Sequence, residues 1–509
     1  FVDVNQIRRQ GYFFSITFSP FSPEKLVTLQ PFCRIPMAAR MNNQYEERLG
    51  TERMLPLIFK MALPAVAAQF VNLLYNIVDR IYIGHIPEIG TNALAGVGVT
   101  TSIVILISSF SAIVGAGGAP LAAMALGQGD RVRAGKFLGN GFMLLILFTV
   151  LTSLVSYLFM EPILRFAGAS AVTLPYAEDY LSVYLLGTLF VEISTGLNTF
   201  INSQGRPNIA MYSVLIGALL NIVLDPIFIF GFKMGVRGAA LATVISQGIS
   251  CIWVILFLRG GKTVLKLKRE NIRFAPRIIL PCIALGLATF IMQASESVIS
   301  VCFNSSLLKY GGDIAVGAMT ILTSVMQFAM LPLQGVAQGA QPILSYNFGA
   351  KNADRVKKTF FRLLTVSLCY SVALWAFVML VPKTFAGIFS PNPELVNFTG
   401  DALRIYCGAL FLFGIQIACQ MTFVSIGNAG CSIIVAVLRK FVLLIPLIYI
   451  MPQLLADKTN AVYTAEPAAD VIAVTCTAIL FSIEFRKALK KLNADSAGGT
   501  QPAKTDLRV

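Results

Sequence analysis

The chain is 509 residues long, with a mean hydropathy of +0.74 and a formal net charge of +15 at pH 7. Hydrophobic residues make up 56% of it and charged residues only 13%, whereas a soluble globular protein carries about 25% charged residues. This composition excludes an ordinary soluble fold and indicates a membrane protein. In a soluble domain such a positive charge would suggest nucleic-acid binding, so its distribution along the chain decides what it means.

The two ends and the middle of the chain differ in composition from the rest. Residues 1–40 begin with Phe1 rather than Met and show no helical period, and Met41 is a more natural start. No basic start precedes an apolar core of the right length, so this segment is not a signal peptide. We expect residues 1–40 to be a disordered or mis-assigned extension, 259–277 to be a basic cytoplasmic linker, and 491–509 to be a disordered tail.

Long apolar stretches recur along the remainder of the chain. Each spans roughly 20 residues or more, enough for a helix to cross about 30 Å of hydrocarbon. The sequence predicts about twelve spans, at 55–83, 92–118, 137–160, 179–203, 208–231, 238–258, 278–303, 314–345, 359–381, 402–426, 432–452 and 468–489. We therefore predict an all-α polytopic membrane protein, with one six-helix bundle in 41–258 and another in 278–490.

The same residue pattern occurs in both halves of the chain, and one constant offset in residue number relates the two copies. Pairs that share this repeat offset are Pro120 and Pro342, Gly127 and Gly349, Asp179 and Asp401, Tyr184 and Tyr406, Ser203 and Ser425, and Gly205 and Gly427. Six spans per half is an even number, so both halves enter the membrane in the same sense, and their pseudo-twofold axis should lie along the membrane normal. Duplicated halves are typical of secondary transporters, whose substrate path lies between them.

Basic residues gather in alternate connections between the spans. With the N-terminus inside, the predicted inner connections hold 22 Lys and Arg residues and the outer connections hold six. The positive-inside rule then places both termini in the cytoplasm. A lipid bilayer accounts for the basic balance, and nucleic-acid binding is not needed to explain it.

Carboxylates inside apolar spans are costly, so each one is a candidate functional residue. Asp79 in the first span and Asp225 in the fifth fall in the outer half of one bundle, and Asn221 shares a helix face with Asp225. Pro226 leaves a carbonyl without its usual donor, so this region offers oxygen ligands to a proton or cation. Two carboxylates in one apolar pocket also favour a bound proton near neutral pH. The alternative is that both acids are interfacial helix-end residues, with Asp79 neutralised by Arg80.

Further charged residues lie inside predicted spans of both halves. Glu296 is the deepest carboxylate of the second half, with Gln293 three residues before it; it either binds a substrate cation or proton, or makes a structural hydrogen bond. Glu192 lies midway along the fourth span and either faces the cavity or is structural. Arg439 and Lys440 either line a water-filled cavity or extend toward the interface, and the second interpretation is favoured.

The uncharged polar residues give weaker signals. Asn198 lies among small and polar residues typical of helix packing, and Gln416 and Gln420 form one polar face in the tenth span. The nine cysteines show no metal-ligand spacing, and neither a Walker motif nor a nucleophile–base arrangement is visible. We expect no enzymatic activity, no cofactor and no metal site, with sodium at Asp79 and Asp225 as the alternative to a proton.

Four segments carry a resemblance to a known family. They are Asn221–Phe232 (Asn-x-x-Leu-Asp-Pro-x-Phe-Ile-Phe-Gly-Phe), Tyr75–Gly84 (Tyr-Asn-x-x-Asp-x-x-Tyr-Ile-Gly), 117–120 (Gly-Gly-Ala-Pro) and 339–342 (Gly-Ala-Gln-Pro). As an ordered set they resemble the multidrug and toxic compound extrusion (MATE) family, and within it the bacterial multidrug exporters. The resemblance extends over residues 41–490.

The resemblance implies a V-shaped pair of six-helix bundles that alternates access by a rocker motion. It also implies export of organic cations by proton or sodium antiport. Asp79, Asn221 and Asp225 match the family's cation-site positions. Asn198 resembles its asparagine in span four and is predicted to take part in cation or proton coupling with these three residues, and Glu296 matches its acid in span seven.

The predicted substrate cavity combines Glu296 with polar and aromatic groups from several spans. These are Tyr75, Glu192, Gln293, Gln416 and Gln420. Some members of the family carry an acid in span ten, where this chain has glutamines, which favours protons at Asp79 and Asp225. We expect a monomeric antiporter of the plasma (inner) membrane that exports amphipathic, mostly cationic small molecules. The rival function is a flippase for a lipid-linked saccharide, whose cavity would be rich in Arg and Lys to hold a pyrophosphate.

Overall fold

The computed structural model describes residues 47–389 and 392–497, and this part of the chain is helical, without a strand. Its elements are α3 (Met54–Gly84), α4 (Gly90–Gly127), α5 (Arg131–Leu158), α6 (Met160–Phe166), α7 (Leu174–Ser203), α8 (Pro207–Pro226), η1 (Ile227–Gly231), α9 (Val236–Arg259), η2 (Arg269–Asn271), α10 (Pro276–Gly349), α11 (Ala353–Leu380), α12 (Pro382–Phe389), α13 (Pro393–Tyr406), η3 (Leu410–Leu412), α14 (Phe413–Ser425), α15 (Ala429–Val437), η4 (Leu438–Leu444), α16 (Ile445–Leu454) and α17 (Lys458–Ala497). The predicted extension 1–40 lies outside the described residues.

In the described ranges, ten helices are long and apolar enough to cross a membrane. A pair bent by 46°, formed by α13 with η3 and α14, makes eleven. Each of the twelve predicted spans overlaps one of these elements, because α10 contains two spans. The predicted all-α polytopic fold is therefore confirmed.

The 74-residue helix α10 is a hairpin of two spans. At Gly312 its backbone has φ 65° and ψ −162°, a conformation that suits glycine because it has no Cβ. Both ends of α10 pack backbone to backbone on α4, with Cys282 against Gly117 and Gly349 against Met124. Gly117 and Met124 are about two helical turns apart, so the chain must reverse direction at Gly312.

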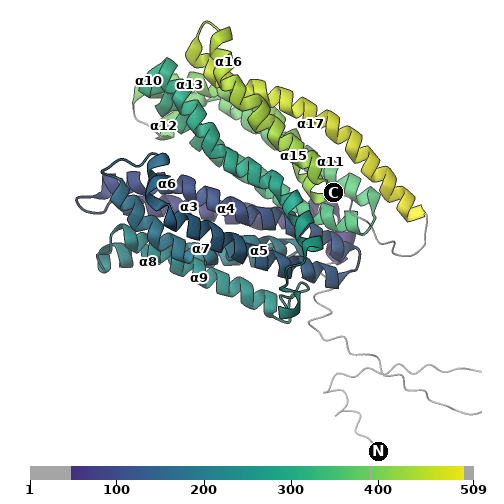
Figure 1. The fold of residues 1–509 in the computed structure, drawn as a ribbon. Coiled ribbons are helices and arrows are strands. Elements are labelled where there is room, and N and C mark those ends of the chain that lie inside the picture. The colour runs from purple at the N-terminus through teal and green to yellow at the C-terminus, as the bar shows by residue number, and fades with distance from the viewer. Residues whose placement is uncertain (1–46, 390–391, 498–509) are drawn as a thin grey trace, which may run out of the picture.

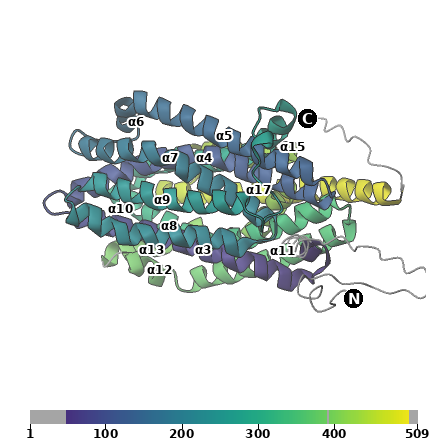
Figure 2. The same cartoon turned by 90° about the horizontal axis from the view of Figure 1, so that it is seen from below.

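The helices form two bundles that correspond to the two halves of the sequence (Figure 1). Helices α3 to α9 form the N-terminal bundle, and α10 to α17 form the C-terminal bundle. The bundles converge where α9 leads through the linker into α10 and spread apart toward α6 and α12. We call these the linker end and the open end of the molecule. The long helices of both bundles follow one common direction (Figure 2).

Backbone contacts at the linker end obey the twofold relation that the repeat predicts. Gly127 of α4 packs on Tyr346 of α10, and Gly349 of α10 packs on Met124 of α4. The repeat offset, which pairs Gly127 with Gly349, maps each of these contacts onto the other. A Cβ on either glycine would overlap the facing carbonyl oxygen, so the close approach requires glycine at both positions. A pseudo-twofold axis therefore passes between the C-terminal ends of α4 and α10.

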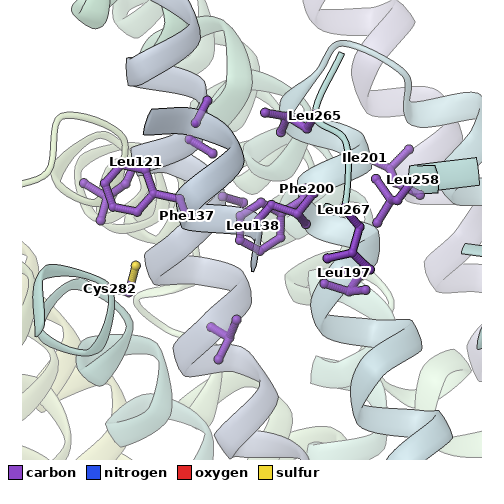
Figure 3. Close-up of a cluster of buried hydrophobic side chains, with 14 of the residues drawn as sticks. Leu121, Phe137, Leu138, Leu197, Phe200, Ile201, Leu258, Leu265, Leu267 and Cys282 are labelled. Carbon is purple, nitrogen blue, oxygen red and sulfur yellow. The ribbon is translucent and has the colours of Figure 1, made fainter. Parts of the chain in front are cut away.

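Hydrophobic packing joins the two bundles near the linker end. One buried cluster combines Phe137 and Phe200 of the N-terminal bundle with Cys282 of α10 (Figure 3). A second buries Ile58 of α3 against Ile343 of α10. Three clusters nearer the open end each belong to a single bundle. The apolar contact between the halves is therefore concentrated at the linker end.

Toward the open end, the facing sides of the bundles lose contact. Phe110 of α4 contacts Phe290 of α10 with ring centroids 4.9 Å apart, but Leu106, one turn further along the same face, is 47% exposed. Phe70 of α3 likewise contacts a phenylalanine ring of α10, whereas Ile77, two turns further, is 40% exposed. The bundles thus leave a space between them that opens away from the linker.

Two predicted segment boundaries need correction. Helix α17 continues to Ala497, so residues 491–497 of the predicted disordered tail are helical. No Gly or Pro lies between Lys487 and Ala497, so nothing in the sequence stops the helix there. Helix α10 begins at Pro276, so the last two residues of the predicted linker belong to it.

Candidate functional site

Two acids that the sequence places on different spans meet inside the N-terminal bundle. Asp79 of α3 and Asp225 of α8 are both buried. Their carboxyl groups are neighbours in the interior of the bundle. A carboxylate has no proton to donate, so a hydrogen bond between the two groups would require a proton on one of them.

An amide and a hydroxyl group complete this acid cluster. Asn221 Nδ2 donates to Asp225 Oδ1 at 3.2 Å and to Thr243 Oγ1 of α9 at 3.2 Å. The Thr243 hydroxyl group in turn interacts with Tyr180 of α7. Tyr75 lies one turn before Asp79 on α3 and is half-buried beside the cluster. Asn221 therefore lies beside the carboxyl pair, as the sequence predicts, whereas Tyr75, predicted for the substrate cavity, also lies beside this pair.

The acid cluster contains oxygen atoms without donors. Asp79 Oδ1, Asn221 Oδ1 and Asp225 Oδ2 are buried, and the described part of the chain supplies no hydrogen-bond partner to any of them. Buried polar atoms in proteins are normally satisfied, so these oxygens indicate a site for a proton or a small hard cation. Asp225 is followed by Pro226 and by the π-helical turn η1, so the regular hydrogen-bond ladder changes directly at the site.

The alternative in which Arg80 neutralises Asp79 is not supported by the geometry. Asp79 points into the bundle, whereas its neighbour Arg80 is exposed. Among the described residues, the ion pairs include none between these two side chains. Asp79 is therefore buried five residues before the end of α3 and makes no ion pair with its neighbour within the described residues.

Glu192 is a third buried carboxyl of the N-terminal bundle. It lies on α7 within hydrogen-bonding reach of Ser108 and Ser111 on α4. Its Oε1 atom has no partner within the described ranges. Its neighbours could not be identified from the sequence, because two serines in a neighbouring span give no pattern that links them to an acid.

Asn198 and Gln420 make equivalent contacts in the two halves. Asn198 Nδ2 donates to the carbonyl oxygen of Ala210 at 3.1 Å, and Gln420 Nε2 donates to that of Ser432 at 3.3 Å. Both contacts join consecutive spans, and the repeat offset maps one onto the other. Ala210 is eleven residues before Asn221 on α8, about 16 Å along a helix. The structure therefore does not bring Asn198 to the acid cluster.

The C-terminal bundle holds its charges as ion pairs. Lys440 Nζ lies 2.8 Å from Glu296 Oε1. Arg439 Nε lies 2.7 Å from Asp470 Oδ1, and Arg439 Nη2 lies 3.1 Å from Glu466 Oε1. The expectation that Arg439 and Lys440 extend toward the interface is wrong, because both are buried and paired. Glu296 pairs with a lysine of a neighbouring helix, a partner that neither of the two alternatives for this residue names.

Glu466 and Asp470 are two charged residues that sequence reasoning missed. Both lie on α17, four residues apart on one helix face, and both are buried against Arg439. Phe413 covers the other side of the guanidinium group, with its ring centroid 4.7 Å away. The predicted last span begins at residue 468, so Glu466 lies just outside it, whereas Asp470 lies in its first turn and is a carboxylate that the cost of charge in an apolar span already indicates.

Glu296 belongs to a polar stripe on the first half of α10. Gln293, Glu296, Ser297 and Ser300 follow the helical face that contacts α4 through Phe290 nearer the linker end. Gln293, Glu296 and Ser300 are exposed. The stripe therefore faces the space between the bundles. Gln293 and Glu296 are the predicted cavity residues that the structure brings together in this stripe.

Gln416, also predicted for the cavity, lies elsewhere. It is buried on α14, one turn before Gln420, and its Oε1 atom has no partner among the described residues. No hydrogen bond within those residues joins either glutamine to Glu296. The structure thus separates the predicted cavity residues into the acid cluster, the polar stripe and the packing of α14.

Two twofold-related helical bundles around a polar space, with buried carboxyl groups in the spans, define a polytopic membrane transporter. The MatE family model matches residues 64–227 and 288–450, one region in each half of the chain. The chain belongs to this family of membrane transporters. The resemblance found in the sequence is confirmed.

Characterised relatives match most of the chain. The multidrug export protein MepA of Staphylococcus haemolyticus is 25% identical over 431 residues, which cover 84% of this chain and 94% of that protein. MepA of Staphylococcus saprophyticus is 25% identical over 434 residues, with the same two shares.

Solved structures show the same fold. A MATE protein in the bent conformation has a TM-score of 0.83 at 22% identity, covering 88% of this chain and 99% of that one. An outward-facing multidrug resistance MATE family transporter has a TM-score of 0.79 at 22% identity, covering 85% and 96%.

Proposed function

We propose that the protein is a secondary active antiporter that exports amphipathic, mostly cationic small molecules in exchange for protons. Membership of the MatE family and similarity to proteins named as multidrug exporters support export of varied organic compounds. The observation that carries the proton exchange is the buried pair of Asp79 and Asp225, whose carboxyl groups approach each other with unsatisfied oxygens. An ionised carboxylate in this position is costly, so a proton or cation is needed to neutralise the site.

Helix α3 offers a physical link between the proton site and the substrate path. It presents Asp79 to the interior of the N-terminal bundle and Ile77 to the space between the bundles. A change in the charge at Asp79 alters the packing of α3 against α8, and therefore the wall of the substrate space. Proton and substrate are coupled in this scheme through one helix, without sharing one pocket.

The structure has the form expected of one end-state of alternating access. The bundles are joined at the linker end by the glycine contacts of α4 and α10 and are apart at the other end. Basic residues of the linker and of α5 and α11 lie at the joined end, which the positive-inside rule assigns to the cytoplasm. We therefore place the termini in the cytoplasm of a cell bounded by the plasma membrane, with the open end facing outward.

A transport assay in sealed vesicles tests this function. Proton and sodium gradients are imposed separately, and accumulation of ethidium is followed by fluorescence. We expect ethidium to accumulate on the acidic side, since protons leaving that side drive the drug into it. For one-for-one exchange, a gradient of one pH unit supports about tenfold accumulation.

Collapse of the proton gradient with an ionophore is the control for this assay. Accumulation that follows a sodium gradient and ignores pH would show that sodium is the coupling ion. Accumulation that follows neither gradient would refute antiport.

The competing flippase function is less well supported. A cavity that holds a pyrophosphate needs several available basic groups. Arg439 is held by the buried Glu466 and Asp470, which leaves Lys440, paired with the exposed Glu296, as a single basic group rather than several. These ion pairs favour the antiporter.

A further inference from the structure

Lys440 and Glu296 form an ion pair whose two members are buried very unequally. The Lys440 side chain is 6% exposed and the Glu296 side chain is 60% exposed, although their charged atoms are 2.8 Å apart. An ammonium group this deeply buried needs an anion beside it, because an unpaired charge there is strongly destabilising. Glu296 has no such need, since water can solvate its carboxylate after a change of side-chain rotamer.

The neighbouring charges leave Lys440 as the group that is free to change partner. Arg439, the preceding residue, is held by two buried carboxylates, Glu466 and Asp470. Lys440 donates to Glu296 alone among the hydrogen bonds of the described residues. Both basic residues lie on the π-helical turn η4, and such turns occur frequently at functional sites.

The position of Glu296 makes the pair reachable by a solute. Glu296 is on the polar stripe of α10 that faces the space between the bundles, with Gln293 and Ser300 exposed beside it. A solute in that space meets the Glu296 carboxylate first, with the Lys440 ammonium directly behind it. A carboxylate group of the solute that replaces Glu296 beside Lys440 gains the buried ammonium group as its partner. The hydration that this carboxylate loses is no greater than the hydration that the released Glu296 regains.

We propose that Lys440 is an anion-binding residue of the substrate path. A carboxylate of the substrate replaces Glu296 on Lys440, and the released Glu296 accepts the cationic group of the same molecule. The site thus selects zwitterionic amphipathic compounds. When such a compound binds, the ion pair of Lys440 with Glu296 is lost, and each of these two residues forms an ion pair with the substrate. This inference rests on the proposed export function and names a substrate class for it.

A simple organic cation behaves differently at this site. Such a cation competes with Lys440 for the carboxylate of Glu296. If the cation binds Glu296, the buried ammonium group of Lys440 is left without its partner. The pair therefore acts as a specificity filter that favours a cation carrying a carboxylate over the same cation without one.

Binding of two matched dyes tests this inference. A rhodamine with a free carboxylate and its methyl ester are titrated into the purified full-length protein in nonionic detergent, with fluorescence anisotropy as the readout. In Lys440→Gln we expect the affinity for the carboxylate dye to fall about tenfold, because a charge-assisted hydrogen bond is lost. The affinity of the same variant for the methyl ester should be unchanged or higher. In Glu296→Gln we expect the opposite order, with the ester weakened and the carboxylate dye unchanged or bound more tightly.

Matched variants keep this test decisive. Lys440→Arg retains the positive charge and should retain the carboxylate dye, which also covers the case in which Lys440→Gln does not fold. Lys487→Gln, which removes an exposed lysine paired with Glu484 on α17, should change neither dye. Equal shifts of both dyes in Lys440→Gln and Glu296→Gln, or no shift in either, would overturn the inference.

The binding test is independent of ion coupling. No gradient is present, and an effect of the Asp79 proton on binding should act on both dyes alike, so the ratio of the two dye affinities reports on Lys440 and Glu296. A failure of the proposed proton exchange would appear in vesicle transport, whereas a failure of the anion site would appear only in the difference between the dyes.

Discussion

Replacing Asp79 with Asn is expected to reduce proton-driven ethidium efflux to the background of protein-free vesicles. The amide has nearly the size of a protonated carboxyl group and can donate a hydrogen bond to Asp225, so the buried cluster stays satisfied and the protein stays folded. It cannot release a proton, so the exchange cycle stops in the neutral state. The initial rate of efflux from vesicles with an imposed pH gradient is the measurement.

Arg80→Gln is the matched control for Asp79→Asn. Arg80 is adjacent in sequence but exposed, so its loss should leave coupled efflux within about twofold of the wild-type rate, as for a surface charge. Wild-type efflux in Asp79→Asn would mean that the coupling proton is carried elsewhere. Asp225 and Glu192 would then be the next residues to substitute, since among the described residues they are the other buried carboxyl groups of this bundle.

Replacing Arg439 with Met is expected to give the largest loss of stability. The change removes the cation between Glu466 and Asp470 and leaves two buried carboxylates facing each other. Breaking a buried pair from one side costs about 3–5 kcal/mol, because the remaining charge is uncompensated. Thermal unfolding of the purified protein in detergent should show this as a clear fall in midpoint.

Two further variants show whether the cause is the buried charge. Arg439→Met combined with Glu466→Gln and Asp470→Asn should recover most of the loss, since no ionised group is left buried in this cluster. Arg165→Met removes an exposed partner of Glu161 and should change stability by less than about 1 kcal/mol. If Arg439→Met melts like wild type, the cluster is not an energetically important ion pair.

Much of the fold follows from patterns that are local in the sequence. Apolar stretches of membrane-spanning length give the spans, and the constant repeat offset gives the twofold relation that Gly127 and Gly349 display. The hairpin at Gly312 is predicted as two spans because the charged residue Asp313 interrupts the apolar run. The end of α17 is not predicted, because charged residues mark the end of a membrane span but do not stop a helix.

The candidate site is predicted where a single rare residue carries the signal. Asp79 and Asp225 stand out because carboxylates are costly in apolar spans, and the structure brings them together. The partners in the C-terminal bundle could not be predicted, because the contact of Lys440 with Glu296 joins residues 144 positions apart and depends on how α10 packs on η4. For Asn198, a polar residue in an apolar span does not indicate the acid cluster, because its side chain makes the contact between α7 and α8.

Proton release on drug binding tests the central claim most directly. Ethidium is added to the purified protein in weakly buffered detergent solution, and a pH indicator reports protons set free. If the carboxyl pair of Asp79 and Asp225 holds the proton that is exchanged for drug, wild type should release protons in proportion to the drug bound, and Asp79→Asn should release none. Drug binding by wild type without any proton release would contradict the account.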